Sequence, residues 1–317
     1  MSFDRAALSR AVEAHGAVVR VVVAEVMGSA PREAGAAMLV WADGEAGTIG
    51  GGALEFAAAT RARAVLARGG PDRVDRVPLG PGLGQCCGGA VTLLTEVWTA
   101  ARLAAAGDGP VVARPLPGAD GEMPLAVRRL LARARGEGLR PPAGVVQGWM
   151  AEPVAVAERE IWVWGAGHVG RALVAVLSPL PGLRLTWIDT DAARFPTVPE
   201  GVAQRIAANP ADLVPEAPAG AEHLIVTFSH ALDLELCHRL LGHGFGTLGL
   251  IGSETKRARF RTRLRTLGHT EAQIARIRCP IGERAFGKHP QAIAVGVAAE
   301  VLRTKGAKQA LGGERKA

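Results

Sequence analysis

The chain has 317 residues, of which 48% are hydrophobic, and a formal net charge of +7. This length suggests about two domains with apolar cores of ordinary size. The positive charge could attract nucleic acid or an anionic ligand, but the densest basic run, residues 256–265, places its charges mostly at alternate positions around a predicted helix. That spacing is typical of a solvated helix. We therefore expect no nucleic-acid partner.

The sequence also lacks the patterns of membrane and exported proteins. No run of about 18 apolar residues could span a membrane, and the residues that follow Met1 predict an amphipathic helix rather than a signal peptide. The cysteines do not form the framework of a disulfide-rich protein; they are Cys86, Cys87, Cys237 and Cys279. We expect a cytoplasmic protein with reduced thiols.

Residues 1–110 predict an α/β domain. Its strands are expected over residues 18–26, 37–41, 47–49, 74–78 and 91–98. Its helices are expected over residues 4–15 and 53–68. Residues 111–159 are rich in Ala, Gly, Pro and Arg, and we expect them to form the rim of this domain and a linker.

A Rossmann-like domain is expected over residues 160–304. Its strands are predicted over residues 161–164, 184–189, 223–228 and 246–250. Helical segments alternate with these strands, which predicts a parallel sheet with crossover helices. Residues 305–317 are polar and charged, and we expect a frayed tail.

Two loops of the first domain carry candidate cofactor-binding residues. Arg32 offers a planar guanidinium that suits a phosphate or a carboxylate, with a surface pair to Glu33 as the alternative. Gly50, Gly51 and Gly52 lead into a helix, where a ligand can approach the backbone and the helix start attracts an anion. A tight turn is the alternative for these glycines.

Cys86 and Cys87 lie in a third glycine-rich loop, residues 80–89. Adjacent cysteines are too close for an ordinary disulfide. Their thiols could bind a soft metal, carry sulfur or contact a sulfur-rich ligand, and simple packing under the loop is the alternative. No partner stands at zinc spacing, so we expect no structural zinc.

The most specific motif follows the apolar strand over 161–164. Gly165 permits a tight turn, Gly167 lets a backbone approach a phosphate, and Gly170 lets the helix pack closely on the strand. The start of that helix supplies free N–H groups for an anion. The sequence therefore predicts a Rossmann-type unit that binds an anionic ligand here.

Two further residues are predicted at this ligand site. Asp189 ends the next strand, 19 residues beyond Gly170, where a dinucleotide-binding unit holds a ribose hydroxyl. His168 stands inside the glycine loop, so it points at or near the ligand, or else lies on the helix surface. Asp189 is the feature that favours an NAD(P)-dependent oxidoreductase, which is the alternative to the function given below.

Six stretches in chain order resemble the XdhC/CoxI family. They are residues 28–33, 47–52, 85–89, 165–170, 249–256 and 279–282. The resemblance extends from about residue 11 to 303 and implies an XdhC/CoxI-type α/β domain followed by a Rossmann-like domain with a parallel sheet. It also implies a protein that binds molybdenum cofactor and shields it during sulfuration by a cysteine desulfurase. Such a protein then inserts the cofactor into the molybdenum-binding subunit of apo xanthine dehydrogenase.

The chain departs from the family at one position, since Ala53 stands where many members have a cysteine. A sulfur ligand at that position is therefore excluded. The sequence shows no catalytic set, neither a serine nucleophile elbow with His and Asp nor a His-Glu-x-x-His motif. We therefore expect a homodimeric cofactor chaperone in purine metabolism, not an enzyme, with no resident metal.

Overall fold

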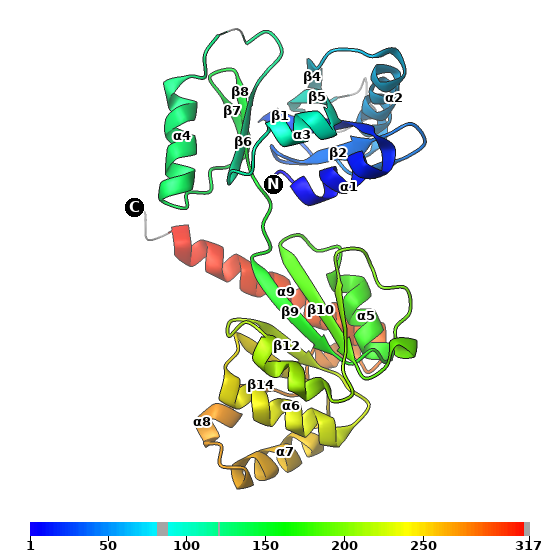
Figure 1. The fold of residues 1–317 in the computed structure, drawn as a ribbon, viewed down its shortest axis with the longest axis vertical. Helices are drawn as coiled ribbons and strands as arrows, with labels where there is room; N and C mark the ends of the chain where they lie inside the picture. Colours follow the sequence, from blue (N-terminus) through cyan, green and yellow to red (C-terminus); the bar gives the residue numbers. More distant parts are fainter. Residues whose placement is uncertain (81–87, 120, 314–317) are drawn as a thin grey trace. The chain divides into compact units, whose positions relative to one another are not determined.

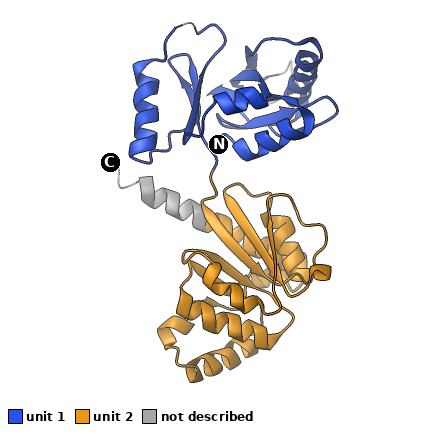
Figure 2. Ribbon diagram, viewed as in Figure 1, with its two compact units in different colours: residues 1–155 blue, residues 156–317 orange. Residues whose placement is uncertain are grey.

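The structure is a computed structural model that describes residues 1–80, 88–119 and 121–313, with only the backbone of residues 304–313 (Figure 1). The chain divides into two compact units, Met1–Ala155 and Val156–Ala317 (Figure 2). Within the described ranges, no helix combines the length and the hydropathy that a membrane span needs.

Unit 1 is built on an antiparallel sheet with the strand order β3-β2-β1-β5-β4. The strands are β1 (Ala17–Met27), β2 (Ala37–Val40), β3 (Glu45–Gly47), β4 (Arg73–Pro78) and β5 (Ala90–Thr99). The helices packed with it are α1 (Arg5–His15), α2 (Gly52–Arg68) and α3 (Ala100–Ala105). On β1, Val19 and Val21 pack with α2, whereas Val18 packs with α1. β1 is therefore buried on both faces, which explains its continuous apolar sequence.

We expected residues 111–159 to form a rim and a linker. Residues 111–155 instead belong to the folded structure of unit 1. They form a second, three-stranded sheet in the order β6-β8-β7. Its elements are β6 (Val111–Pro115), α4 (Leu125–Gly136), β7 (Gly144–Val146) and β8 (Trp149–Pro153). The sequence concealed these strands because they are short and because two of their buried positions carry charge, Arg114 and Glu152.

Buried ion pairs join the two sheets of unit 1. Arg20 of β1 donates to both carboxylate oxygens of Glu152 at 2.9 and 2.6 Å, and Arg114 donates to Glu96 of β5 at 2.5 and 2.7 Å. Burial alone would raise the pKa of Glu152, but Arg20 and Arg114 hold it below its ordinary value. The charges are thus paired inside the unit, as buried charges must be.

Unit 2 is a parallel sheet with the strand order β11-β10-β9-β12-β13-β14. The strands are β9 (Arg159–Trp164), β10 (Leu183–Asp189), β11 (Ala203–Ile206), β12 (Glu222–Ile225), β13 (Thr247–Leu250) and β14 (Ile277–Arg278). Counted within the unit, this order is 3-2-1-4-5-6, the Rossmann order. The predicted parallel sheet with crossover helices is confirmed.

Helices cover both faces of this sheet, which makes three layers (Figure 1). The α-helices are α5 (His168–Leu177), α6 (His230–His243), α7 (Glu254–Thr266), α8 (Glu271–Ile274) and α9 (Pro290–Gly313). Short 3-10 helices span Ala192–Arg194, Pro210–Glu216 and Arg284–Phe286. Ile161 and Val163 of β9 pack on the side of α5 and α9, whereas Trp162 and Trp164 pack on the side of α6 and α7. α9 continues to Gly313, into the segment that we expected to fray.

Candidate functional site

The strand order of unit 2 determines where a ligand can bind. β9 is paired with β10 on one side and with β12 on the other. The chain adds β10 and β11 on the first side and β12 to β14 on the second, so the strand order reverses between β9 and β12. Open parallel sheets bind ligands at such a switch point, outside the carboxyl ends of the strands. The loop from Gly165 to Gly167 leaves β9 there, and the loop that ends at Ser229 leaves β12 beside it.

Gly167 and Gly170 are explained by different features of the structure. A side chain at Gly170 would collide with the carbonyl oxygen of Gly165, so the helix approaches the strand as closely as predicted. Gly167 faces open space, with no atom within 4 Å of the position that a Cβ would take. α5 starts after Gly167 without a side-chain cap, and His168 at its first position is exposed. Free N–H groups and open space make this helix start accessible to an anion.

Asp189 supports this loop from the end of β10. Its carboxylate accepts the N–H of Ala166 at 2.5 Å and the N–H of Thr190 at 2.6 Å, and it forms an ion pair with the Nε of Arg194 at 2.7 Å. Burial alone would raise the pKa of Asp189, but these donors lower it below its ordinary value. Asp189 is only 3% exposed, so its carboxylate holds the loop in shape instead of projecting toward solvent.

Arg194 and Phe228, which follow β10 and β12, contact each other, and the sequence did not reveal this pair. The Arg194 guanidinium lies 4.4 Å from the centre of the Phe228 ring. Phe228 follows β12 and is 65% exposed, an unusual position for a large apolar ring. Its outer face is available for stacking, and Arg194 connects this face to Asp189.

A buried lysine fixes the loop that carries Phe228. Lys256 of α7 donates to Asp233 of α6 at 2.5 Å and to the carbonyl oxygen of Ile251 at 2.9 Å. Asp233 in turn accepts the hydroxyl of Thr227 at 2.7 Å, and Thr227 accepts the N–H of Ser229 at 3.1 Å. Lys256 lies in the stretch 249–256, the one sequence signal that could have drawn attention to it.

In unit 1, the predicted loops meet at one end of the first sheet. Met27 at the end of β1 pairs with Ala90 at the start of β5, so the loops that precede Ala90 and follow Met27 begin side by side. A side chain at Gly50, whose φ is +132°, would come within 2.5 Å of Pro31. The loops at 28–35 and 48–51 therefore pack against each other.

Arg32 lies at an open hollow of about 430 Å³ in this region. Its guanidinium makes a long contact, 4.0 Å from Nη2 to the Sδ of Met1. Among the described residues no acidic side chain pairs with Arg32, so the alternative, a surface pair to Glu33, does not form. Its guanidinium donors remain available for an anion.

The carboxylate of Glu55, on α2, accepts hydrogen bonds from the triple-glycine loop that leads into this helix. Glu55 accepts the hydroxyl of Thr48 at 2.6 Å and the N–H groups of Ile49 and Gly51 at 3.0 Å each. Burial would raise the pKa of Glu55, but these hydrogen bonds lower it below its ordinary value. The N–H of Gly50 donates to the Thr48 hydroxyl at 3.1 Å, so an anion must displace Thr48 at Gly50 and Glu55 at Gly51, whereas Gly52 starts α2 without a side-chain cap.

The predicted residues Cys86 and Cys87 lie outside the described residues. Of the other cysteines, Cys237 is fully buried, and burial raises the pKa of its thiol well above the usual range. Burial also raises the pKa of Cys279, although Lys256 and Arg257 oppose it. In the part of the chain that the structure describes, no three His, Cys, Asp or Glu side chains are grouped to hold a metal ion.

The fold and these loops define a two-unit α/β protein with a Rossmann-like second unit, in which an open helix start lies at the switch point of the sheet. Residues 11–76 match the XdhC and CoxI family, and residues 161–301 match the XdhC Rossmann domain. The chain belongs to the XdhC and CoxI family.

Two known proteins extend this comparison. The uncharacterized protein YqeB of Escherichia coli (strain K12) is 30% identical over 149 residues, which are 44% of this chain but only 26% of YqeB. The chain therefore matches about a quarter of that relative's length. The crystal structure of a xanthine dehydrogenase from Bacillus halodurans is 19% identical, covers 95% of each chain and has a TM-score of 0.67. This likeness shows that the two proteins share a fold.

Proposed function

We propose that this protein binds molybdenum cofactor as cargo, protects it during sulfuration and inserts it into apo xanthine dehydrogenase. Membership of the XdhC and CoxI family supports a role in xanthine dehydrogenase maturation. The Bacillus halodurans protein of the same fold carries the name of that enzyme. Under this proposal the protein carries out no chemical step of its own.

The observation that carries the proposal is the open helix start at Gly167. Molybdenum cofactor is an anionic pterin with a phosphate and a metal held by a dithiolene. Gly167 leaves room beside the uncapped N–H groups of α5, where the phosphate would lie. The exposed ring of Phe228 would stack on the flat pterin.

Unit 1 carries proposed cofactor contacts of its own. Arg32 has donors without an acidic partner among the described residues, and Gly52 begins α2 with free N–H groups. We keep Cys86 and Cys87 as proposed contacts to the sulfur-ligated metal, because thiols are suited to that chemistry. Gly50 and Gly51 would take part only when Thr48 and Glu55 release their N–H groups.

The alternative, an NAD(P)-dependent oxidoreductase, depends on a free carboxylate at Asp189. Both oxygens of Asp189 are already engaged, by hydrogen bonds from Ala166 and Thr190 and by the ion pair with Arg194. A ribose hydroxyl would have to displace one of these donors. This geometry favours the cofactor chaperone over the oxidoreductase.

Delivery would require protein partners. A free cofactor is oxidised in water, so we propose transfer inside a complex with the molybdenum-binding subunit of xanthine dehydrogenase, after sulfuration with a cysteine desulfurase. A carrier must release its cargo, so its affinity should be micromolar, about −8 kcal/mol. We further propose a homodimer, which sedimentation of the purified protein would test.

The direct test is to purify the protein from a host that makes molybdenum cofactor, oxidise it and measure pterin fluorescence. We expect stoichiometric pterin and no turnover of substrate. Absence of pterin from such a preparation would contradict the proposal. A parallel titration with NADH separates the alternatives, because tight NADH binding would favour the oxidoreductase.

A further inference from the structure

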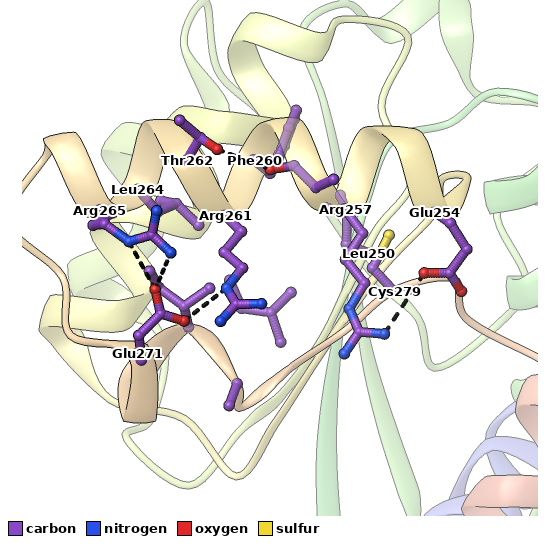
Figure 3. A pocket seen from close by; sticks show the side chains of 14 residues that line it. Leu250, Glu254, Arg257, Phe260, Arg261, Thr262, Leu264, Arg265, Glu271 and Cys279 are labelled. Carbon is purple, nitrogen blue, oxygen red and sulfur yellow. Dashed lines mark hydrogen bonds and ion pairs between the residues drawn. The ribbon is translucent and has the colours of Figure 1, made fainter.

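A cavity of about 630 Å³ lies between α7, α8 and the edge of the unit 2 sheet, separate from the glycine loop (Figure 3). Its apolar lining is contributed by β13, α7, α8 and the β14 segment; these residues are Leu250, Phe260, Leu264, Ile274, Ile277 and Cys279. Its volume falls within the range of small-molecule sites, roughly 300 to 1,000 Å³. The described part of the chain contains no segment that fills it.

One rim of this cavity is a row of arginines on α7. Arg257, Arg261 and Arg265 are four residues apart, so they lie on one face of the helix, and Figure 3 shows their side chains reaching toward the cavity. Along the axis the row spans about 12 Å, at roughly 1.5 Å per residue. The cavity thus combines an apolar floor with a cationic edge.

The three arginines are not equally available. Glu271 of α8 accepts hydrogen bonds of 2.7 Å from both Arg261 and Arg265. Arg257 forms an ion pair of 3.7 Å with Glu254, too long for a hydrogen bond, and Glu254 instead accepts a bond of 3.1 Å from Arg284. Arg257 therefore keeps free donors at the mouth of the cavity.

Cys279 lies on the floor near this end of the cavity. Burial raises the pKa of its thiol, so the sulfur is neutral at physiological pH and does not repel an anion. A molecule bound against the floor would cover this thiol. Cys279 is therefore a natural reporter of occupancy.

We propose that this cavity binds an organic monoanion with a flat apolar body, such as an aromatic carboxylate. Its anionic group pairs with the fork of Arg257, and its body covers the floor from Leu250 to Ile277. Planar oxyanions match the guanidinium geometry, and the apolar lining accounts for the rest of the molecule. This site is independent of the cofactor function proposed above.

The test is a titration of the full chain with anilinonaphthalene sulfonate, an aromatic anion whose fluorescence rises in apolar sites. We expect saturable binding that Arg257→Glu weakens by about ten- to a hundred-fold, the loss of a charge-assisted contact. Arg259→Glu is the matched control. It makes the same charge change on the same helix, but its side chain is outside the cavity lining and pairs with no acidic group among the described residues. We expect it to leave the affinity nearly unchanged.

Two further measurements keep the proposal falsifiable if a charge reversal disturbs the fold. Ala258→Leu narrows the cavity with no change of charge and should also weaken binding. In a Cys86→Ser, Cys87→Ser background, the bound probe should slow the reaction of Cys279 with a thiol reagent. Equal weakening by Arg257→Glu and Arg259→Glu, or unchanged Cys279 reactivity at saturating probe, would overturn the proposal.

Discussion

The two units each place a glycine loop at the start of a helix, but they satisfy the loop N–H groups differently. In unit 1, Glu55 reaches back from α2 and takes the N–H groups of Ile49 and Gly51. In unit 2, Asp189 takes only the N–H of Ala166, ahead of the helix, and the space beside Gly167 stays open. Similar glycine motifs therefore give one loop closed by its own carboxylate and one open to a ligand.

Both units bury ion pairs, and unit 2 also buries a neutral histidine. Unit 1 buries ionised side chains in pairs, such as Arg20 with Glu152. Unit 2 buries His223 as a neutral ring that accepts the Trp164 N–H at 3.2 Å, and its own Nε2 has no partner. Burial, with a smaller effect of His243, lowers the pKa of His223 to about 3. As pH falls, unit 2 should therefore begin to lose stability at a higher pH than the one at which the ion pairs of unit 1 are lost.

The largest expected effect is that of Asp189→Asn on unit 2. The change leaves Arg194 with a neutral partner and weakens the support of the glycine loop, at a cost of about 3 kcal/mol. Hydrogen exchange of the segment 165–177 measures it. Asp191→Asn is the matched control, because Asp191 is exposed and caps a short helix, a role that asparagine also fills. If both variants exchange alike, Asp189 does not hold the loop.

The next effect is the pH dependence of unit 2. The folded pKa of His223, about 3, lies below its ordinary value of 6.5, so the stability from neutral His223 is complete above 6.5 and is lost as pH falls toward 3. The slope is at most about 1.4 kcal/mol per pH unit. Between pH 7 and 5 we expect a loss of about 2 kcal/mol, measured by hydrogen exchange of β12.

His223→Phe removes this titration and should flatten the slope between pH 7 and 5. It also leaves the Trp164 N–H without an acceptor, which lowers stability at pH 7 by about 1–3 kcal/mol. The comparison therefore concerns the slope and not the absolute value. Equal slopes for the parent and His223→Phe would show that His223 is not the titrating group.

The smallest expected effect is that of Glu55→Gln on unit 1. The amide keeps the shape of the side chain but loses the charge that strengthens its bonds to Thr48, Ile49 and Gly51, at a cost of about 1 kcal/mol. Hydrogen exchange of the segment 48–55 measures this loss of local stability. Glu45→Gln, which removes a surface pair with Arg63, should cost less than about 0.5 kcal/mol. Similar losses in both variants would contradict the closed loop of unit 1.

The parts of the fold that the sequence predicted correctly are those with local signals. The strand over 161–164, the glycine loop and the helix after it are contiguous in sequence, so one motif specifies all three. Residues 111–153 were misread because Arg114 and Glu152 interrupt the apolar pattern, and their partners lie on other strands. No local rule indicates an ion pair whose members are 132 residues apart.

The same reasoning explains which site residues were missed. Gly165, Gly167 and Gly170 belong to one motif, whereas the pairs Asp189 with Arg194 and Asp233 with Lys256 form only through tertiary folding. Glu55 follows the glycines that we singled out, but its role depends on its side chain turning back to the loop. The sequence indicates where a glycine loop lets a ligand approach the backbone. Only the structure shows which side chains already accept hydrogen bonds from the N–H groups of that loop.

The most direct test of the central claim is cofactor retention in Gly167→Val, with Glu55→Gln as the comparison. Valine fills the open space beside the α5 start and should weaken cofactor affinity by about ten- to a hundred-fold, while the closed loop of unit 1 makes Glu55→Gln nearly neutral. Both proteins are purified from a cofactor-producing host, and bound pterin is measured after oxidation. The account predicts loss of pterin in Gly167→Val alone. A folded Gly167→Val protein that retains as much pterin as the parent would contradict it and assign the site to unit 1.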